Sequence, residues 1–304
     1  MVSVENAELN KQLTFAKNKI LRKTLLFLLP SLVILLIFFI GPIIMTFFFA
    51  FTNMSLTGTT AQSIDFVGFQ NFVSMFSDPN FKTSFITTMV FLIFSGIIGQ
   101  QVLGFLLAVL MKNKNKTFRK FVGGTVMAGW VTPEIIVAFT FVSFLHDGGT
   151  LNQFLSWFGV EPISWLFTFP MVSVVVANIW KGSALSMLMF QSALDNIPFS
   201  VEEAAKIDGA NRWQRMWRIT IPMIKNTIFT NLVIITLGTL GVFTLIYTMT
   251  GGGPANATAT LPIFMYEQAF VNYQLGYGTA ISLVILIIGI IISLIYIRLL
   301  KTDD

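Results

Sequence analysis

Two charged residues, Glu134 and Lys181, each lie near the middle of a long apolar stretch. A charge at the centre of a lipid bilayer costs about 2.5–3.5 kcal/mol on insertion scales, so both side chains should face the protein interior or a water-filled path. Because their charges are opposite and their depths similar, the sequence predicts an ion pair. Two roles fit this pair: a structural link between two helices, which we favour, or a lining of a solute path that bonds hydroxyl groups.

Amide, hydroxyl and aromatic side chains on the fourth and fifth apolar stretches could extend such a path. Polar groups suit the edges of sugar rings and aromatic groups suit their faces, although interhelical hydrogen bonding is the commoner role of a membrane Ser or Thr. Ser186 and Thr244 have the same character. The candidate solute path comprises Glu134, Asn178, Trp180, Lys181, Ser183, Thr239 and Tyr247.

Other chemistry is largely excluded by the residue types. The chain has no cysteine and a single histidine, His146, so disulfides, thiolate sites and multi-histidine metal sites are not expected. Paired intramembrane carboxylates are lacking, which disfavours an integral membrane enzyme. No GxxxxGK[ST] sequence occurs, so we expect no cofactor in this chain, and ATP would have to be held by another chain.

The elements that position these residues must cross a membrane. Of the 304 residues, 55% are hydrophobic and 11% charged, and the mean hydropathy is +0.78, which excludes a soluble globular fold. About 20 apolar helical residues span a bilayer core. We therefore predict an all-α integral membrane protein with one six-helix domain over 25–299. The predicted spans are 25–51, 84–111, 121–145, 167–194, 226–248 and 276–297.

The basic residues indicate the orientation of these spans. Seventeen of the 19 Lys and Arg residues fall in 1–24, in 112–120, in 206–225 and in the end of the chain from 298. By the positive-inside rule, both termini, including the tail 300–304, are expected to be cytoplasmic. The net charge of +5 then reflects topology and contact with anionic lipid, and no nucleic-acid partner is expected.

The N-terminal segment has two expected parts. Residues 1–24 show apolar side chains at helical spacing and predict an amphipathic helix on the cytoplasmic surface. The apolar run that follows exceeds the 7–15 residues of a signal-peptide core, so we expect it to remain as a membrane anchor.

The segment 196–222 is too long to be a simple connection. Ser200 and Glu203 fit a capping box at the start of a helix, and Gly209 suits the left-handed residue that ends it. A second amphipathic stretch carries Trp213 and Trp217 on one stripe until Pro222 closes it. The expected structure is a helix–turn–helix. Periodicity alone fits an interfacial hairpin at the lipid headgroups equally well.

Sequence motifs in this loop resemble a known family. Glu203-Ala204-Ala205, Asp208-Gly209-Ala210 and the 219–222 stretch ending in Pro222 are similar to the EAA loop of permease subunits in bacterial binding-protein-dependent ABC importers. Residues 66–72 with Asp78-Pro79 resemble the first external loop of the carbohydrate branch of that family. Residues 250–254 and 260–262 resemble the last external loop of its maltose-F and glycerol-phosphate-A type members.

The resemblance implies a set of partners and a location. These are a second, non-identical permease subunit, two ATPase subunits that hold ATP and Mg, an external solute-binding protein and a sugar, all at the bacterial inner membrane. It also implies that Glu203 contacts the ATPase, a role compatible with capping. The coupling residues would be Glu203, Ala204, Ala205, Asp208, Gly209, Ala210 and Pro222.

Two other interpretations remain at this stage. One is a self-sufficient secondary transporter or channel, which would show ion-coupled uptake without partner subunits. Such proteins commonly carry internal repeats, and the two halves of this chain show no clear similarity to each other. The other is an ABC permease for a non-sugar solute such as glycerol phosphate.

Overall fold

The computed structural model describes residues 17, 24, 27–58 and 61–301, which are almost entirely helical. Within these residues only one isolated β-bridge occurs, between Thr52 and Phe66. The predicted all-α membrane class is confirmed. The predicted amphipathic helix at 1–24 and the extreme C-terminus at 302–304 lie, apart from residues 17 and 24, outside the described residues.

Among the described residues, five helices are long and apolar enough to cross a membrane, or up to six if one bent pair counts as a single span. The bent pair is Arg212–Met223 with Lys225–Leu240, which meet at 68°. The five are Phe27–Ala50, Pro79–Lys112, Glu134–Ser156, Pro170–Asp195 and Leu275–Leu299.

Shorter elements make up these helices and the connections between them. The first span contains η1 (Leu36–Ile40) and α2 (Gly41–Ala50), and the second contains α4 (Pro79–Phe91), η3 (Leu92–Gln100) and α5 (Gln101–Lys112). The remaining elements up to α11 are α3 (Gln70–Ser77), α6 (Lys116–Val131), α7 (Glu134–Leu145), α8 (Thr150–Ser156), α9 (Trp165–Thr168), α10 (Pro170–Asp195) and α11 (Phe199–Ile207). After them come α12 (Arg212–Arg215), η4 (Met216–Thr220), α13 (Ile221–Met223), α14 (Lys225–Leu240), α15 (Thr244–Thr250), α16 (Leu261–Tyr266), η5 (Glu267–Val271) and α17 (Leu275–Lys301).

The third predicted span is wrong as a single helix, because it breaks between α6 and α7. Thr132 is extended with ψ of 128°, and Pro133 begins the next segment without a backbone N–H. A proline disfavours the helical conformation of the residue before it, which explains the break. Both the backbone N–H and the hydroxyl of Thr132 donate to the carbonyl of Ala128, at 3.1 and 2.7 Å, and so end the last turn of α6. The break places Glu134 in the first turn of α7.

The fifth predicted span is also wrong as a single helix. It separates into α14 and α15 at residues 241–243, where Gly241 ends α14 in a turn. Gly241 has a φ of −93° and donates its N–H to the carbonyl of Gly238 at 3.3 Å. Helix α14 is long and apolar enough to cross a membrane only when it is counted together with Arg212–Met223, from which it is bent by 68°.

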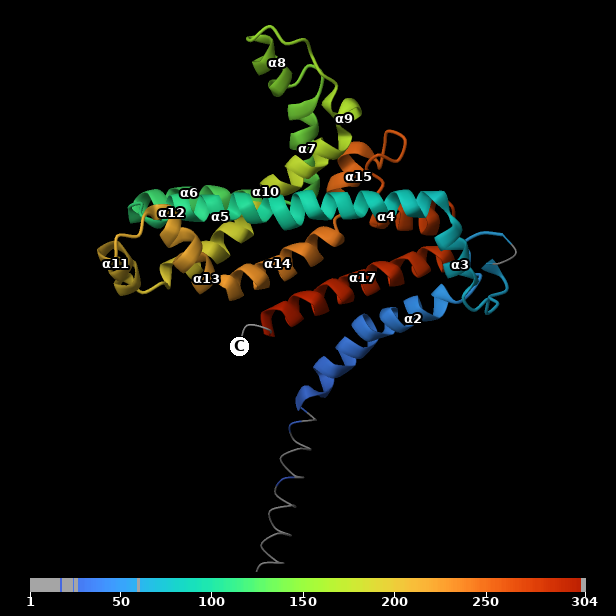
Figure 1. Cartoon of the computed structure of the whole chain (residues 1–304). Coiled ribbons are helices and arrows are strands. Elements are labelled where there is room, and N and C mark those ends of the chain that lie inside the picture. Colours follow the sequence, from blue (N-terminus) through green and yellow to red (C-terminus); the bar gives the residue numbers. More distant parts are fainter. Residues whose placement is uncertain (1–16, 18–23, 25–26, 59–60, 302–304) are drawn as a thin grey trace, which may run out of the picture.

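The long helices lie alongside one another with the connecting helices at the two ends (Figure 1). Helix α10 packs along α5, α17 packs along α2, and α14 contacts both η3 and α17. Helices α11–α13 lie at one end of this bundle, called here the α11 end, and α3 lies at the opposite end, called here the α3 end (Figure 1). Helices α7 and α8 project from its side.

Small residues allow the central helices to approach closely. A Cβ at Gly104 on α5 would lie 2.9 Å from the backbone nitrogen of Met187 on α10. Around this contact, Ala108, Phe190 and Leu194 form a buried apolar cluster. Close packing of this kind holds α5 and α10 together where hydrophobic burial alone gives no driving force in lipid.

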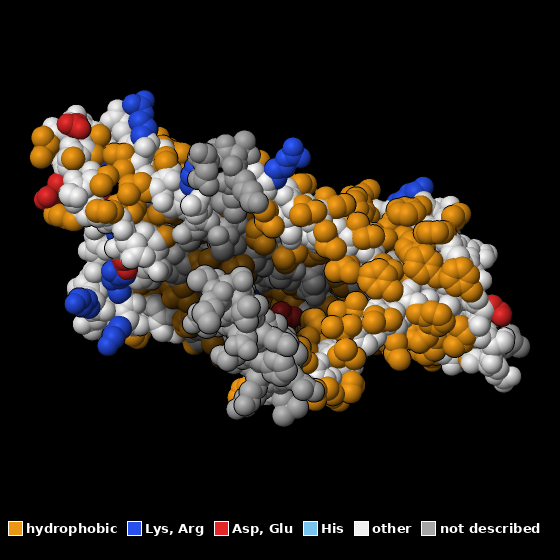
Figure 2. Space-filling view, turned by 90° about the horizontal axis from the view of Figure 1, so that it is seen from below, with side chains coloured by type: hydrophobic (Ala, Val, Ile, Leu, Met, Phe, Trp, Pro, Cys, Tyr) orange, Lys and Arg blue, Asp and Glu red, His pale blue; other side chains and the backbone are white. Residues whose placement is uncertain are grey.

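Hydrophobic side chains gather most densely over the half of the face in Figure 2 that lies away from the α11 end, whereas most of the charged side chains on that face lie toward the α11 end. This distribution fits a chain that contacts lipid or other apolar surfaces over much of its length and water at the α11 end.

Candidate functional site

The predicted ion pair between Glu134 and Lys181 forms in the structure. Lys181 Nζ lies 3.1 Å from Glu134 Oε1, and the side chains are 19% and 35% exposed, respectively. Glu134 is in the first turn of α7 and Lys181 is near the middle of α10. The pair therefore connects α7, directly after the break at Pro133, to the central helix α10.

This pair lines a small cavity of about 200 Å³ enclosed by α7, α10 and α14. Asn178 and Thr239 also line it, so four of the seven candidate path residues come together there. Asn178 is 5% exposed and donates a hydrogen bond of 2.8 Å to the hydroxyl of buried Ser95. The cavity offers a charged pair, the carboxamides of Gln100 and Asn178 and the hydroxyl of Thr239, which can exchange hydrogen bonds with water or with a hydroxylated solute.

The other three candidate path residues lie elsewhere. Trp180 lines a separate, mostly apolar cavity of about 530 Å³, where its ring packs edge-on against Phe141 at 5.9 Å. Ser183 donates a hydrogen bond to the carbonyl of Trp180 in its own helix. Tyr247 stacks on Phe243 at 5.1 Å. Of the two further polar residues, Ser186 accepts a hydrogen bond from Asn231 in the buried interface of α10 and α14.

At the α11 end, the predicted helix–turn–helix is present. Gly209 has a φ of +75° and ends α11, as expected for a residue in the left-handed region. A Cβ there would meet nothing within 4 Å, so the backbone conformation alone selects glycine.

The predicted capping box at Ser200 and Glu203 is wrong. Helix α11 begins at Phe199 after Pro198, and no side chain caps it, so Ser200 already lies inside the helix. The fixed φ of proline suits the position before a helix, which explains the earlier start. A capping box forms instead on α12, where Asn211 and Gln214 each accept a 2.8 Å bond from the backbone N–H of the other.

Helix α11 has two distinct faces. Ala205 is buried, whereas Glu203, Ala204 and Asp208 are exposed and Ile207 is 86% exposed. An apolar side chain that is so exposed, beside two free carboxylates at a helix end, forms a surface suited to a protein partner.

The opposite face of α11 is tied to the membrane helices. Glu202 forms an ion pair with Lys112 at the end of α5, and nearby Arg119 of α6 pairs with Asp195 at the end of α10. The first pair links the helix–turn–helix to the second predicted span, and the other links α6 to the end of α10, directly before the helix–turn–helix.

The second helix of the loop continues further than predicted. Helical structure runs without a break from Arg212 to Met223, so Pro222 does not close it and the chain bends at Ile224. Proline is tolerated there because it occupies the start of a new helical turn after the π-type segment η4. Trp213 and Trp217 share one side of this helix as predicted, with ring centroids 5.6 Å apart.

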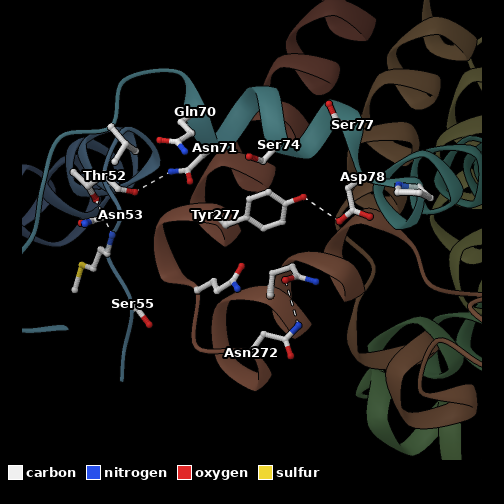
Figure 3. Close-up of a pocket in the computed structure, with 15 residues that line it drawn as sticks. Thr52, Asn53, Ser55, Gln70, Asn71, Ser74, Ser77, Asp78, Asn272 and Tyr277 are labelled. Carbon is white, nitrogen blue, oxygen red and sulfur yellow. Dashed lines mark hydrogen bonds between the residues drawn. The ribbon is translucent and has the colours of Figure 1, made fainter. Parts of the chain in front are cut away.

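A large polar cavity of about 760 Å³ at the α3 end was not predicted from the sequence (Figure 3). Hydroxyl and carboxamide side chains from 52–79 and 268–277 line it. Tyr277 donates a hydrogen bond of 3.2 Å to Asp78, and Asn71 donates to the carbonyls of Ala50 and Thr52 at 2.9 Å. Because the lining comes from two loops some 200 residues apart, only its density of Asn, Gln and Ser could have marked it in the sequence.

Little else in the described residues points to other chemistry. Burial raises the pKa of the Glu267 carboxyl, which lies beside this polar cavity. No group of three or more His, Cys, Asp or Glu residues that could hold a metal ion occurs among the described residues.

Comparison with known proteins gives a consistent result over the whole chain. Residues 100–301 match the family model described as binding-protein-dependent transport system inner membrane component. The sulfoquinovosyl glycerol transport system permease protein SmoG of Agrobacterium fabrum is 31% identical over 92% of this chain and 90% of its own length. The trehalose/maltose transport system permease protein MalF of Thermococcus litoralis is 31% identical over 90% of this chain and 92% of its own length.

A solved structure agrees with this relationship. A chain of a bacterial alginate ABC transporter, in complex with an alginate pentasaccharide-bound periplasmic protein, superposes with a TM-score of 0.79. It is 27% identical and the match covers 94% of this chain and 97% of that chain.

Proposed function

Because this chain belongs to the family of binding-protein-dependent transport system inner membrane components, we propose that it forms part of the path by which a sugar or oligosaccharide enters a bacterial cell. The family places it in a cell membrane as a permease component of an ABC transporter rather than as an enzyme. The observation that carries the sugar assignment is the match of nearly the full chain to permeases named for carbohydrate substrates.

The partners are a second permease subunit, non-identical to this one, two ATPase subunits and an external solute-binding protein. ATP and Mg are bound by the ATPase subunits. The exposed face of α11, with Glu203 and Ile207, would contact the ATPase. Movement of that contact would reach the membrane helices through the ion pair of Glu202 with Lys112. The α11 end is then cytoplasmic, in line with the basic residues gathered there.

The opposite end would receive the solute from the binding protein. The polar cavity around Asn71, Asp78 and Tyr277 opens at that end (Figure 3). Its uncharged amide and hydroxyl groups suit either saccharide hydroxyls or the surface of the binding protein. The smaller cavity at Glu134 and Lys181 lies between the two ends and would bond the solute, or the water that replaces it, in one conformational state.

The direct test is to copurify this chain with its partner subunits and identify the bound solute by mass spectrometry. A sugar or oligosaccharide that also competes for uptake supports the proposal. Copurification of glycerol phosphate or of another non-sugar solute, with competition by that compound alone, would contradict the sugar assignment and leave the ABC permease role intact.

A further inference from the structure

A basic cavity of about 580 Å³ lies between the end of α5 and the helices α11–η4. The face of α11 that lines it carries Phe199, Glu202 and Lys206, and is not the face that exposes Glu203 and Ile207. The cavity is therefore separate from the surface proposed to contact the ATPase. Five cationic side chains line it: Lys112, Lys114, Lys206, Arg212 and Arg215.

These positive charges are only partly compensated. Glu202 is the one carboxylate in the lining, and it pairs with Lys112. Lys206 lies 5.8 Å from the ring of Phe199, and Arg215 donates a 2.7 Å hydrogen bond to the carbonyl of Ala210. In the part of the chain that the structure describes, Lys114 and Arg212 form no ion pair.

Such a concentration of like charge repels itself unless an anion binds there. Five donors of the Lys and Arg type, two of them guanidinium groups, match the oxygens of a phosphate. The chemistry of the cavity thus points to a phosphate-bearing ligand.

The apolar part of the lining indicates the source of that phosphate. Val109, Leu110 and Ile219 line the same cavity, and Leu110 is 58% exposed. A free phosphate compound has no apolar part that could contact these exposed apolar side chains, which run along α5 into the membrane-spanning region. The acyl chain of a phospholipid would cover them.

We propose that this cavity binds the headgroup of an anionic phospholipid, with its phosphate among Lys114, Arg212 and Lys206 and its acyl chain along Leu110. Basic pockets between membrane helices near a cytoplasmic surface bind anionic headgroups in this manner. The bound lipid would hold α11 and α12 at the membrane surface, and so would fix the position of the helix–turn–helix whatever solute the transporter carries.

The test uses the full chain purified in detergent and measures its thermal stability while phosphatidylglycerol is added. Phosphatidylcholine with the same acyl chains serves as the zwitterionic lipid, and inorganic pyrophosphate as the free anion. The variant is Lys114→Gln/Arg212→Gln. The matched control is Lys116→Gln/Lys120→Gln, which removes the same charge from exposed positions of α6 outside the cavity.

The proposal expects phosphatidylglycerol to stabilise the chain more than phosphatidylcholine does. It expects the cavity variant to need about tenfold more phosphatidylglycerol for the same stabilisation, whereas the control needs less than about twofold more. If the double variant does not elute as a folded species, Arg212→Gln alone should show a smaller shift in the same direction.

Three results would overturn the proposal. Equal stabilisation by both lipids would show that the cavity does not select an anionic headgroup. An equal shift in the control variant would reduce the effect to general surface charge. Stabilisation by pyrophosphate as strong as that by phosphatidylglycerol would assign the cavity to a free phosphate compound. None of these measurements depends on uptake or on ATP hydrolysis, so they are independent of the sugar assignment.

Discussion

Lys181 Nζ lies 3.1 Å from Glu134 Oε1, so the one cation inside α10 meets the carboxylate that directly follows the break at Pro133. The carboxylate comes from the first turn of α7, where the positive end of the helix dipole favours a negative charge. The pair thus compensates two charges that would each be costly in a bilayer, and it links α7 to α10 just after the break that separates α7 from α6.

Neutralising one member of this pair should destabilise the protein. Glu134→Gln or Lys181→Met leaves a partly buried charge without its partner, and we expect a loss of about 1–2 kcal/mol, reduced from fully buried cases because Glu134 is 35% exposed. The double variant should recover most of that loss. Thermal stability in detergent measures it, and additive losses in the double-mutant cycle would show that the pair is not coupled. Recovered stability without recovered uptake would favour a direct role in the solute path.

The link between Lys112 and Glu202 should transmit movement of α11. Glu202→Lys places two cations together at the end of α5, and we expect it to weaken the position of α11 by about 1 kcal/mol and to lower uptake. The swapped variant Lys112→Glu/Glu202→Lys restores opposite charges and should regain most of the uptake. Equal uptake defects in the single and swapped variants would mean that the charge pair is not the connection.

Gly209 should be intolerant of a β-branched residue. Gly209→Val forces that residue to a φ near +75°, which costs about 1–3 kcal/mol even though no neighbouring atom obstructs the side chain. Membrane insertion should survive while uptake collapses. Gly209→Asn is the control, because asparagine adopts the left-handed conformation more readily, and it should keep much more activity. Normal solute-stimulated ATPase activity in the valine variant would show that the turn at Gly209 is not needed to couple the membrane helices to the ATPase.

The exposed carboxylate of Glu203 should contribute to association with the ATPase. Glu203→Lys reverses a charge on the exposed face of α11, and we expect copurification of the ATPase subunits to fall at least severalfold. Glu161→Lys is the matched control, since Glu161 is also an exposed carboxylate and lies in the connection between α8 and α9. If both variants copurify the ATPase as well as the unmodified chain does, Glu203 is not part of the contact.

The sequence predicts the helices of this protein well where length and apolar character decide the outcome. The second, fourth and sixth spans appear as single helices close to their expected bounds, because an uninterrupted apolar run of this length has only one stable conformation in lipid. The pairing of Glu134 with Lys181 was predictable for a related reason. Two isolated opposite charges at similar depth have few other partners.

The conformational preferences of proline and glycine explain most of the differences between the predicted and the observed helix bounds. Pro133 and Gly241 divide two of the predicted spans, but the apolar character of the surrounding residues hides these breaks in a hydropathy pattern. At α11, Pro198 starts the helix before Ser200 can cap it. The polar cavity at Asn71 and Tyr277 was missed because its two loops meet only in the folded chain (Figure 3).

The most direct test of the account is uptake into proteoliposomes that contain this chain alone or together with the second permease, the ATPase subunits and the binding protein. The account predicts that the chain alone neither transports a sugar nor hydrolyses ATP, and that the complete set does both when solute and ATP are supplied. The complete set without ATP controls for nonspecific leakage. Ion-coupled uptake by this chain without any partner would contradict the account.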